Sequence, residues 1–207
     1  MKDSGVEWIG EIPAHWTLLP GFKVYKENKI KNIGMIEERV LSLSYGNIII
    51  KPKEKLVGLV PESFETYQIV NPGDIIIRCM DLQNDKTSLR TGIAKDRGII
   101  TSAYLNLNVF NNVISEYLHH YLHMLDTTKV LYKFGTGLRQ NLSYFDFKRL
   151  PVIFPDLKEQ ENILKYIDTN TTKIDSIIDL QKKYITQLKE YKATLIDSCV
   201  TGKVRVR

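Results

Sequence analysis

The chain has 207 residues, and 29 Lys and Arg against 24 Asp and Glu give it a formal net charge of +5 at pH 7. With 43% hydrophobic residues and only 7 Pro and 12 Gly, it is not a disordered or fibrous chain. No apolar run approaches the roughly 20 residues that a membrane span needs. Residues 1–5 lead into no apolar segment typical of a signal peptide. We therefore expect a soluble, cytoplasmic protein with no membrane partner.

Between about residues 40 and 155, apolar residues come in short runs bounded by turn formers, which predicts strands. These runs cover residues 40–43, 48–50, 74–78, 98–100 and 103–109. Asn71, Pro72, Gly73 and Asp74 predict a turn, because Pro presets one backbone dihedral and Gly tolerates positive φ. Helical spacing at residues 115–125 predicts one helix. Residues 1–155 are thus expected to form a β-rich domain.

Residues 156–207 have a helical pattern instead. Asp156, with Glu159 three places on, is typical of a capping box and predicts a helix to about residue 167. The polar run at residues 170–172 predicts a bend. Residues 172–199 contain no Pro or Gly, so a second helix of roughly 28 residues and about 42 Å is expected, ending near Gly202.

This second helix carries an apolar stripe with spacings of three and four, typical of a helix packed along another helix. The stripe consists of Ile174, Ile177, Ile178, Tyr184, Ile185, Leu188, Tyr191 and Leu195. A homodimer, or docking on a partner's helix, is favoured because one small β domain cannot cover so broad a stripe. The alternative is a long core helix of a monomer.

The usual signatures of enzymes do not appear. Residues 135–140 begin like a dinucleotide-binding loop but have Gln140 where the third Gly belongs, and no phosphate-binding loop sequence occurs. His119 and His123 have zinc-ligand spacing on one helix face, yet no third ligand can be named, which favours a surface or packing role. We find no catalytic group, and expect no cofactor and no metal.

Two segments, residues 78–91 and 135–144, combine cations with amides and hydroxyls, as a surface that reads DNA requires. The candidate DNA-binding residues are Lys51, Lys53, Arg78, Gln83, Asn84, Lys86, Arg90, Arg139 and Gln140. Ordinary polar loops have the same composition, and composition alone does not separate the two. Asn141 and Ser143, for instance, would also suit a cap on the following turn.

Five stretches in order resemble the specificity subunits of type I restriction–modification systems. Residues 8–16 resemble the opening of such a subunit. Residues 73–85 and 98–104 resemble the body of its target recognition domain. Residues 135–160 resemble the exit from that domain into the conserved helical region, and residues 200–204 resemble the usual end of the helix.

The resemblance implies a non-catalytic reader of double-stranded DNA. In this family a target recognition domain reads half of a bipartite site, and conserved helices pack antiparallel and dock methyltransferase subunits. Full-length members carry two recognition domains and two helices, whereas this chain has one of each. The resemblance therefore implies an α+β protein, with a recognition domain at residues 1–155 and a helical spacer at residues 156–207. The spacer would form an antiparallel coiled coil with a partner. The chain is then a half-subunit that dimerises, or a fragment of a longer chain.

Two other classes of function stay open at this point. The first is a protein-interaction module that uses the helical stripe and never touches DNA. The second is an enzyme, either a nuclease or a methyltransferase, which would show turnover on its own.

Overall fold

The computed structural model describes residues 1–52, 63–84, 87, 89–134 and 141–205. The chain divides into two compact units, Met1–Glu161 and Asn162–Arg207. In the described part of the chain, no helix is long and apolar enough to cross a membrane.

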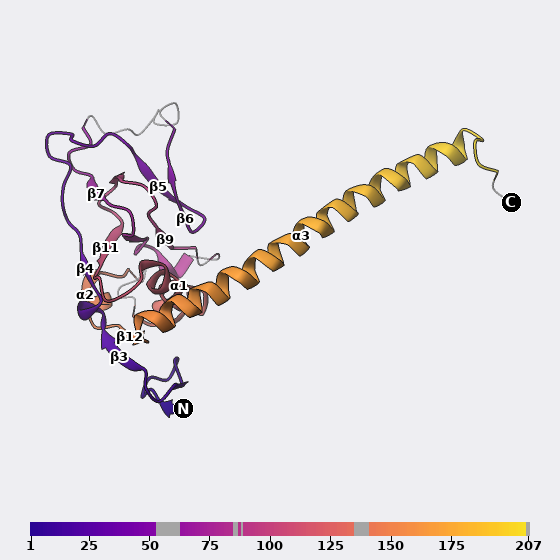
Figure 1. Ribbon diagram of the computed structural model, residues 1–207. Coiled ribbons are helices and arrows are strands. Elements are labelled where there is room, and N and C mark those ends of the chain that lie inside the picture. Colours follow the sequence, from indigo (N-terminus) through magenta and orange to yellow (C-terminus); the bar gives the residue numbers. More distant parts are fainter. Residues whose placement is uncertain (53–62, 85–86, 88, 135–140, 206–207) are drawn as a thin grey trace. The chain divides into compact units, whose positions relative to one another are not determined.

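The first unit is built on antiparallel strands (Figure 1). Among the described residues its largest sheet has the strand order β4–β11–β8–β9, formed by Tyr25–Glu27, Leu105–Val109, Ile75–Ile77 and Thr91–Ile93. Four further pairs are β1 (Lys2–Asp3) with β2 (Glu11–Ile12), β3 (Thr17–Pro20) with β12 (Pro151–Phe154), β5 (Leu41–Ser44) with β6 (Asn47–Ile50), and β7 (Gln68–Val70) with β10 (Gly98–Ile100). All five predicted strands are confirmed, each within two residues of its predicted bounds.

The core of this unit lies around β8. Because β8 is flanked by β11 and β9 and is covered on both faces, Ile75, Ile76 and Ile77 are all buried. A continuous β-branched run is what such a strand requires. The predicted turn before it is also confirmed, since the Asp74 N–H donates to the Asn71 carbonyl at 3.0 Å and Gly73 has a φ of +88°.

Helix α1 (Ser115–Thr127) confirms the helix predicted at residues 115–125. Its buried face includes Leu118, Leu122 and Leu125. The hydroxyl of Tyr121 donates to the Pro151 carbonyl at 2.6 Å, and that of Tyr117 to the Ile153 carbonyl at 3.2 Å. The helix is thereby fixed against β12.

Short helical turns connect these elements. They are the 3₁₀ turns η1 (Gly21–Lys23), η3 (Leu82–Asn84) and η4 (Val130–Phe134), and the five-residue helix α2 (Tyr144–Lys148). Ser143 begins α2 with a capping box, in which the Asp146 carboxylate accepts from the Ser143 N–H at 2.8 Å. The alternative role considered for Ser143, a cap on the following turn, is therefore confirmed.

Helix α3 runs without interruption from Leu157 to Val200 (Figure 1). The predicted bend at residues 170–172 is wrong, as is the predicted length, because the 44 residues span about 66 Å. The polar side chains there bond back within the helix: the Asn170 amide donates to the Tyr166 carbonyl at 2.7 Å, and the Thr171 hydroxyl to the Ile167 carbonyl at 2.9 Å. Side chains that bond in this way do not have to break a helix.

The two ends of α3 follow the sequence more closely. The Asp156 carboxylate accepts from the Glu159 N–H at 2.8 Å, as an N-cap does. The Glu159 carboxylate does not complete the predicted capping box, because it accepts instead from the Trp16 indole at 3.1 Å and lies 2.7 Å from His15 Nε2. At the other end Gly202 adopts a φ of +74°, which glycine tolerates, just beyond Val200.

Candidate functional site

In the loop that follows β8, residues 78–81 are held by the side chain of Arg90. This side chain is only 5% exposed, and its guanidinium donates to three backbone carbonyls. Nη1 lies 3.2 Å from the Arg78 oxygen and 2.6 Å from the Met80 oxygen, and Nη2 lies 2.7 Å from the Asp81 oxygen. The prediction that Arg90 contacts DNA is therefore corrected: Arg90 shapes the loop from inside.

The backbone of Arg90 fixes the same loop to the core. Its N–H donates to the buried Asp126 carboxylate at 3.0 Å, and its carbonyl accepts from the Arg78 N–H at 2.8 Å. Asp81 has a φ of +58°, a left-handed conformation that is uncommon outside glycine. The guanidinium bond to the Asp81 carbonyl supports this sharp change of direction.

The described parts of the two polar segments singled out in the sequence meet here, at residues 79–81 and 141–142. The Asp81 N–H donates to Asn141 Oδ1 at 2.9 Å, and the Leu142 N–H donates to the Cys79 carbonyl at 2.8 Å. Asn141 thus holds the neighbouring loop and does not act as the cap considered for it. Residues that are distant in sequence meet at one place on the first unit.

The predicted DNA-binding residues have different surroundings. Arg78, Gln83 and Asn84 are exposed on this loop, where the Asn84 amide donates to Asp81 Oδ1 at 2.8 Å. Lys51 is exposed just after β6, and its N–H is bonded to the Val40 carbonyl at 2.8 Å. Four predicted residues lie outside the described residues, namely Lys53, Lys86, Arg139 and Gln140.

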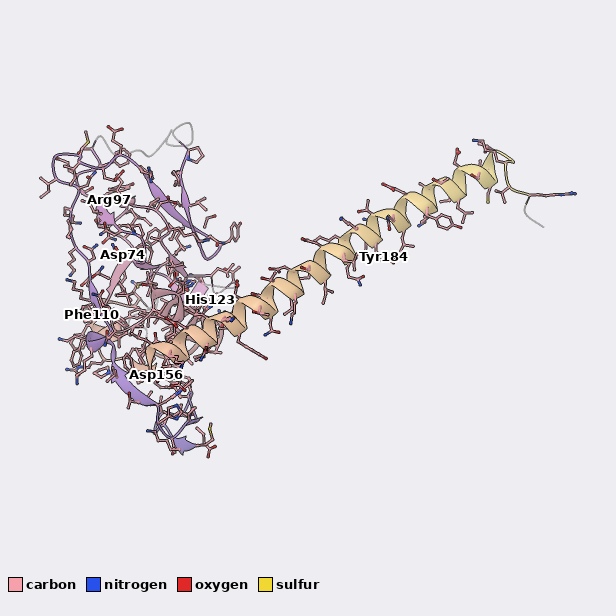
Figure 2. All side chains as sticks on the ribbon, in the orientation of Figure 1. Asp74, Arg97, Phe110, His123, Asp156 and Tyr184 are labelled. Atoms are coloured by element: carbon pink, nitrogen blue, oxygen red, sulfur yellow. The ribbon has the colours of Figure 1, made fainter. Side chains whose placement is uncertain are left out.

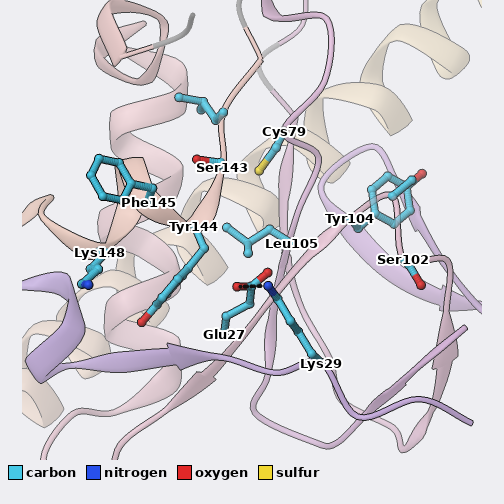
Figure 3. A pocket seen from close by; sticks show the side chains of 12 residues that line it. Glu27, Lys29, Cys79, Ser102, Tyr104, Leu105, Ser143, Tyr144, Phe145 and Lys148 are labelled. Carbon is cyan, nitrogen blue, oxygen red and sulfur yellow. Dashed lines mark ion pairs between the residues drawn. The ribbon is translucent and has the colours of Figure 1, made fainter.

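A hollow of about 460 Å³ opens beside this loop (Figure 3). Its floor includes Cys79 and Leu142, the two residues whose backbones join the polar segments. The remaining lining comes from β4 and the residues after it, from the first residue of β11 and the residues before it, and from α2 and its N-cap. It consists of Glu27, Lys29, Ser102, Ala103, Tyr104, Leu105, Ser143, Tyr144, Phe145 and Lys148.

Sequence reasoning did not find this hollow. Residues 144–148 of α2 bring Tyr144, Phe145 and Lys148 to it, and this mixture of aromatic residues with a cation was the available signal. Glu27 and Lys29 lie more than 100 residues before α2 in the sequence. They form an ion pair, with 2.9 Å between Glu27 Oε2 and Lys29 Nζ. Burial raises the pKa of the Cys79 thiol to about 12, so this part of the floor is uncharged near neutral pH.

The histidines of α1 lie close together on the helix. The His119 and His123 rings stack with their centroids 6.1 Å apart. No group of three or more His, Cys, Asp or Glu residues that could hold a metal occurs in the described part of the chain. Burial lowers the pKa of His119 to about 4, so its imidazole is neutral at pH 7.

The apolar stripe predicted on α3 is exposed. Each of its eight residues is between 44% and 66% accessible, and Figure 2 shows one of them, Tyr184, standing out from the helix. Leu180 and Ile196 are also exposed on α3 and were not included in the predicted stripe. Large apolar side chains gathered along one element are typical of an interaction surface.

Two solved structures share the fold of this chain. One is a chain from a study of complex assembly and conformational transition of the type I R-M system, with a TM-score of 0.63 and 16% identity over 91% of this chain and 46% of that one. The other is the HsdS subunit from Thermoanaerobacter tengcongensis, with a TM-score of 0.60 and 16% identity over 94% of this chain and 47% of that one. The chain has the fold of an HsdS subunit. It spans about half the length of these two chains.

The resemblance expected from the five sequence stretches is thus confirmed in the fold. No protein-family model and no curated protein matches the chain in sequence. The HsdS fold also confirms the α+β class, with a β-rich part followed by the long helix α3.

Proposed function

We propose that this chain is a DNA-recognition subunit of a type I restriction–modification system. It binds double-stranded DNA through the β-rich residues 1–155 and has no catalytic activity of its own. The fold shared with HsdS is the single observation that carries this proposal. Because the chain spans about half of an HsdS chain, it reads one half of a bipartite target.

The recognition surface centres on the loop held by Arg90. Arg78, Gln83 and Asn84 carry the forked guanidinium and amide groups that discriminate base edges in the major groove. Lys51 and Lys53 are the proposed phosphate contacts, and Lys86, Arg139 and Gln140 complete the set. Because Arg90 fixes the backbone of residues 78–81, placing Arg78 on DNA costs little conformational entropy.

Residues 156–207 supply the contacts with other subunits. The exposed stripe of α3 packs antiparallel against the same helix of a second copy, and the pair docks the methyltransferase subunits. A two-fold dimer uses the same surface on both copies, so the two half-sites are then inverted repeats.

The test is selection of binding sites from a random pool of duplex DNA, with the methyltransferase subunits added. The amount of DNA that the protein retains should fall steeply as the salt concentration rises, because each phosphate contact releases counterions. Arg78→Ala and Gln83→Ala should each relax selection at one base pair, whereas Lys51→Ala should weaken all sequences alike. Lys182→Ala on α3 is the matched control and should change neither property.

A protein-interaction module without DNA binding is the second candidate, and the exposed stripe of α3 favours it. If the chain does not bind duplex DNA even at low salt, this result would support the interaction module and contradict the DNA reader. For the enzyme classes, we expect the purified chain to show no turnover with Mg²⁺ or with S-adenosylmethionine. Methylation should appear only when the methyltransferase subunits are present.

A further inference from the structure

The hollow beside the Arg90-held loop has the size of a small-molecule site. Its volume of about 460 Å³ lies within the roughly 300–1,000 Å³ typical of ligand pockets. Its floor is apolar, because it is formed by the buried side chains of Leu105, Leu142 and Cys79. A planar apolar group can therefore rest on this floor without leaving a buried polar atom unpaired.

The walls of the hollow are aromatic. Tyr144 and Phe145 come from α2, and Tyr104 comes from the residue before β11 (Figure 3). Phe145 is 61% exposed, and the Arg149 guanidinium carbon lies 5.1 Å from its ring centroid. An exposed aromatic ring beside a cation is the arrangement on which unstacked bases rest in proteins that bind single strands.

The polar groups of the hollow are of both signs. The Glu27 carboxylate is mostly buried and pairs with Lys29, and a carboxylate has more acceptor positions than one ammonium occupies. Lys29 and Lys148 are exposed, and both line the hollow. Glu27 disfavours a simple anion, whereas the two lysines disfavour a purely apolar ligand.

We infer that this hollow binds a single nucleotide whose base is not stacked on a neighbouring base. The base lies against Phe145 and Tyr144, and an amino group on its edge donates to Glu27. The phosphate contacts Lys29 and Lys148. Bases that carry an amino group, such as adenine and cytosine, are therefore preferred over thymine.

Two sources can supply this nucleotide. One is a free mononucleotide. The other is a nucleotide extruded from DNA bound at the neighbouring loop, and this source rests on the proposed function. Cys79 follows Arg78 in the chain and lines the hollow, so the hollow borders that loop.

The first arm of the test is calorimetric titration of the full chain with dAMP, dCMP and TMP. We expect saturable binding of dAMP and dCMP and weaker binding of TMP. Phe145→Ala and Glu27→Gln should each weaken dAMP binding about tenfold or more. Phe22→Ala, at an exposed phenylalanine outside the lining, is the matched control and should leave binding unchanged.

The second arm uses duplex DNA with 2-aminopurine, whose fluorescence rises when it leaves the base stack. Brightening in the wild type that is lost in Phe145→Ala and Glu27→Gln would support the extruded source, with or without binding of free dAMP. Binding of dAMP without any binding of duplex would support the hollow and contradict the proposed function. The inference is overturned if neither probe responds, or if both variants respond like the wild type while their thermal unfolding is unchanged.

Discussion

At the scale of single residues, Arg90 is a cation that the sequence assigned to DNA and the structure assigns to the protein. Spacing and composition do not distinguish a guanidinium that faces solvent from one that faces three carbonyls, because the difference lies in how the chain returns on itself. Arg78 has the same chemistry and stays exposed. The polar loops were therefore predictable, but which of their arginines faces solvent was not.

Replacing Arg90 with Ala should destabilise the protein by about 2–4 kcal/mol, because three partly buried carbonyls lose a charged donor. This corresponds to a fall in melting temperature of roughly 5–15 °C, which circular dichroism can measure. The melting temperature of Arg90→Lys should lie between those of the wild type and Arg90→Ala, since one ammonium group does not reproduce the planar guanidinium. Arg78→Ala is the control and should change the melting temperature little. An Arg90→Ala protein that melts with the wild type would contradict the structural role.

His119 gives a prediction about pH. Its pKa is lowered by burial to about 4 in the folded chain, against about 6.5 when unfolded. Between these values only the unfolded chain binds the proton, so stability is complete above pH 6.5 and falls as pH drops toward 4. The slope from this group is at most about 1.4 kcal/mol per pH unit. His119→Gln should show a smaller loss of melting temperature between pH 7.5 and pH 5 than the wild type; an equal loss would contradict this.

At the scale of elements, β8 was predictable from the sequence, whereas β3 and β12 were not. Ile75–Ile77 is a continuous β-branched run, whereas β3 and β12 are half-buried strands in which Pro20 lies opposite Pro151. Proline weakens the strand pattern, and the pairing joins the two ends of the first unit. The bend in α3 was predicted from residues of low helix propensity, but their cost of at most about 0.7 kcal/mol each does not break a helix of 44 residues.

Gln160 joins three elements, and its role was not visible in the sequence. Its buried side chain accepts from the Ile114 N–H before α1 at 2.9 Å and donates to the Pro155 carbonyl at 3.0 Å. Gln160→Ala should cost about 1–3 kcal/mol, because the N–H and the carbonyl lose their partners. Chemical denaturation would measure this, with the exposed Glu161→Ala as the control. A Gln160→Ala protein as stable as that control would show that α1 begins independently of α3.

At the scale of the whole molecule, the exposed apolar stripe of α3 is long enough for a helix pair. In the proposed dimer, a second copy of the chain supplies the symmetry-related helix. Burying a side chain as large as Leu or Ile contributes about 1.5–3 kcal/mol, so an eight-residue stripe supports a stable helix pair. A continuous helix of about 66 Å is longer than one turn of DNA, roughly 34–36 Å. Such a helix is long enough to separate two half-site readers in the proposed dimer.

The dimer is tested by changing Leu188 and Leu195 to Asp together. In a two-fold pair this places four carboxylates in the apolar contact, so association should weaken by at least about a thousandfold. Light scattering after size-exclusion chromatography should give twice the chain mass for the wild type and one chain mass for the variant. Thr186→Asp with Ala193→Asp has the same spacing on the opposite face of α3 and should remain dimeric, with equal helix content by circular dichroism. A wild type that stays monomeric at every concentration would remove both the dimer and the inverted-repeat target.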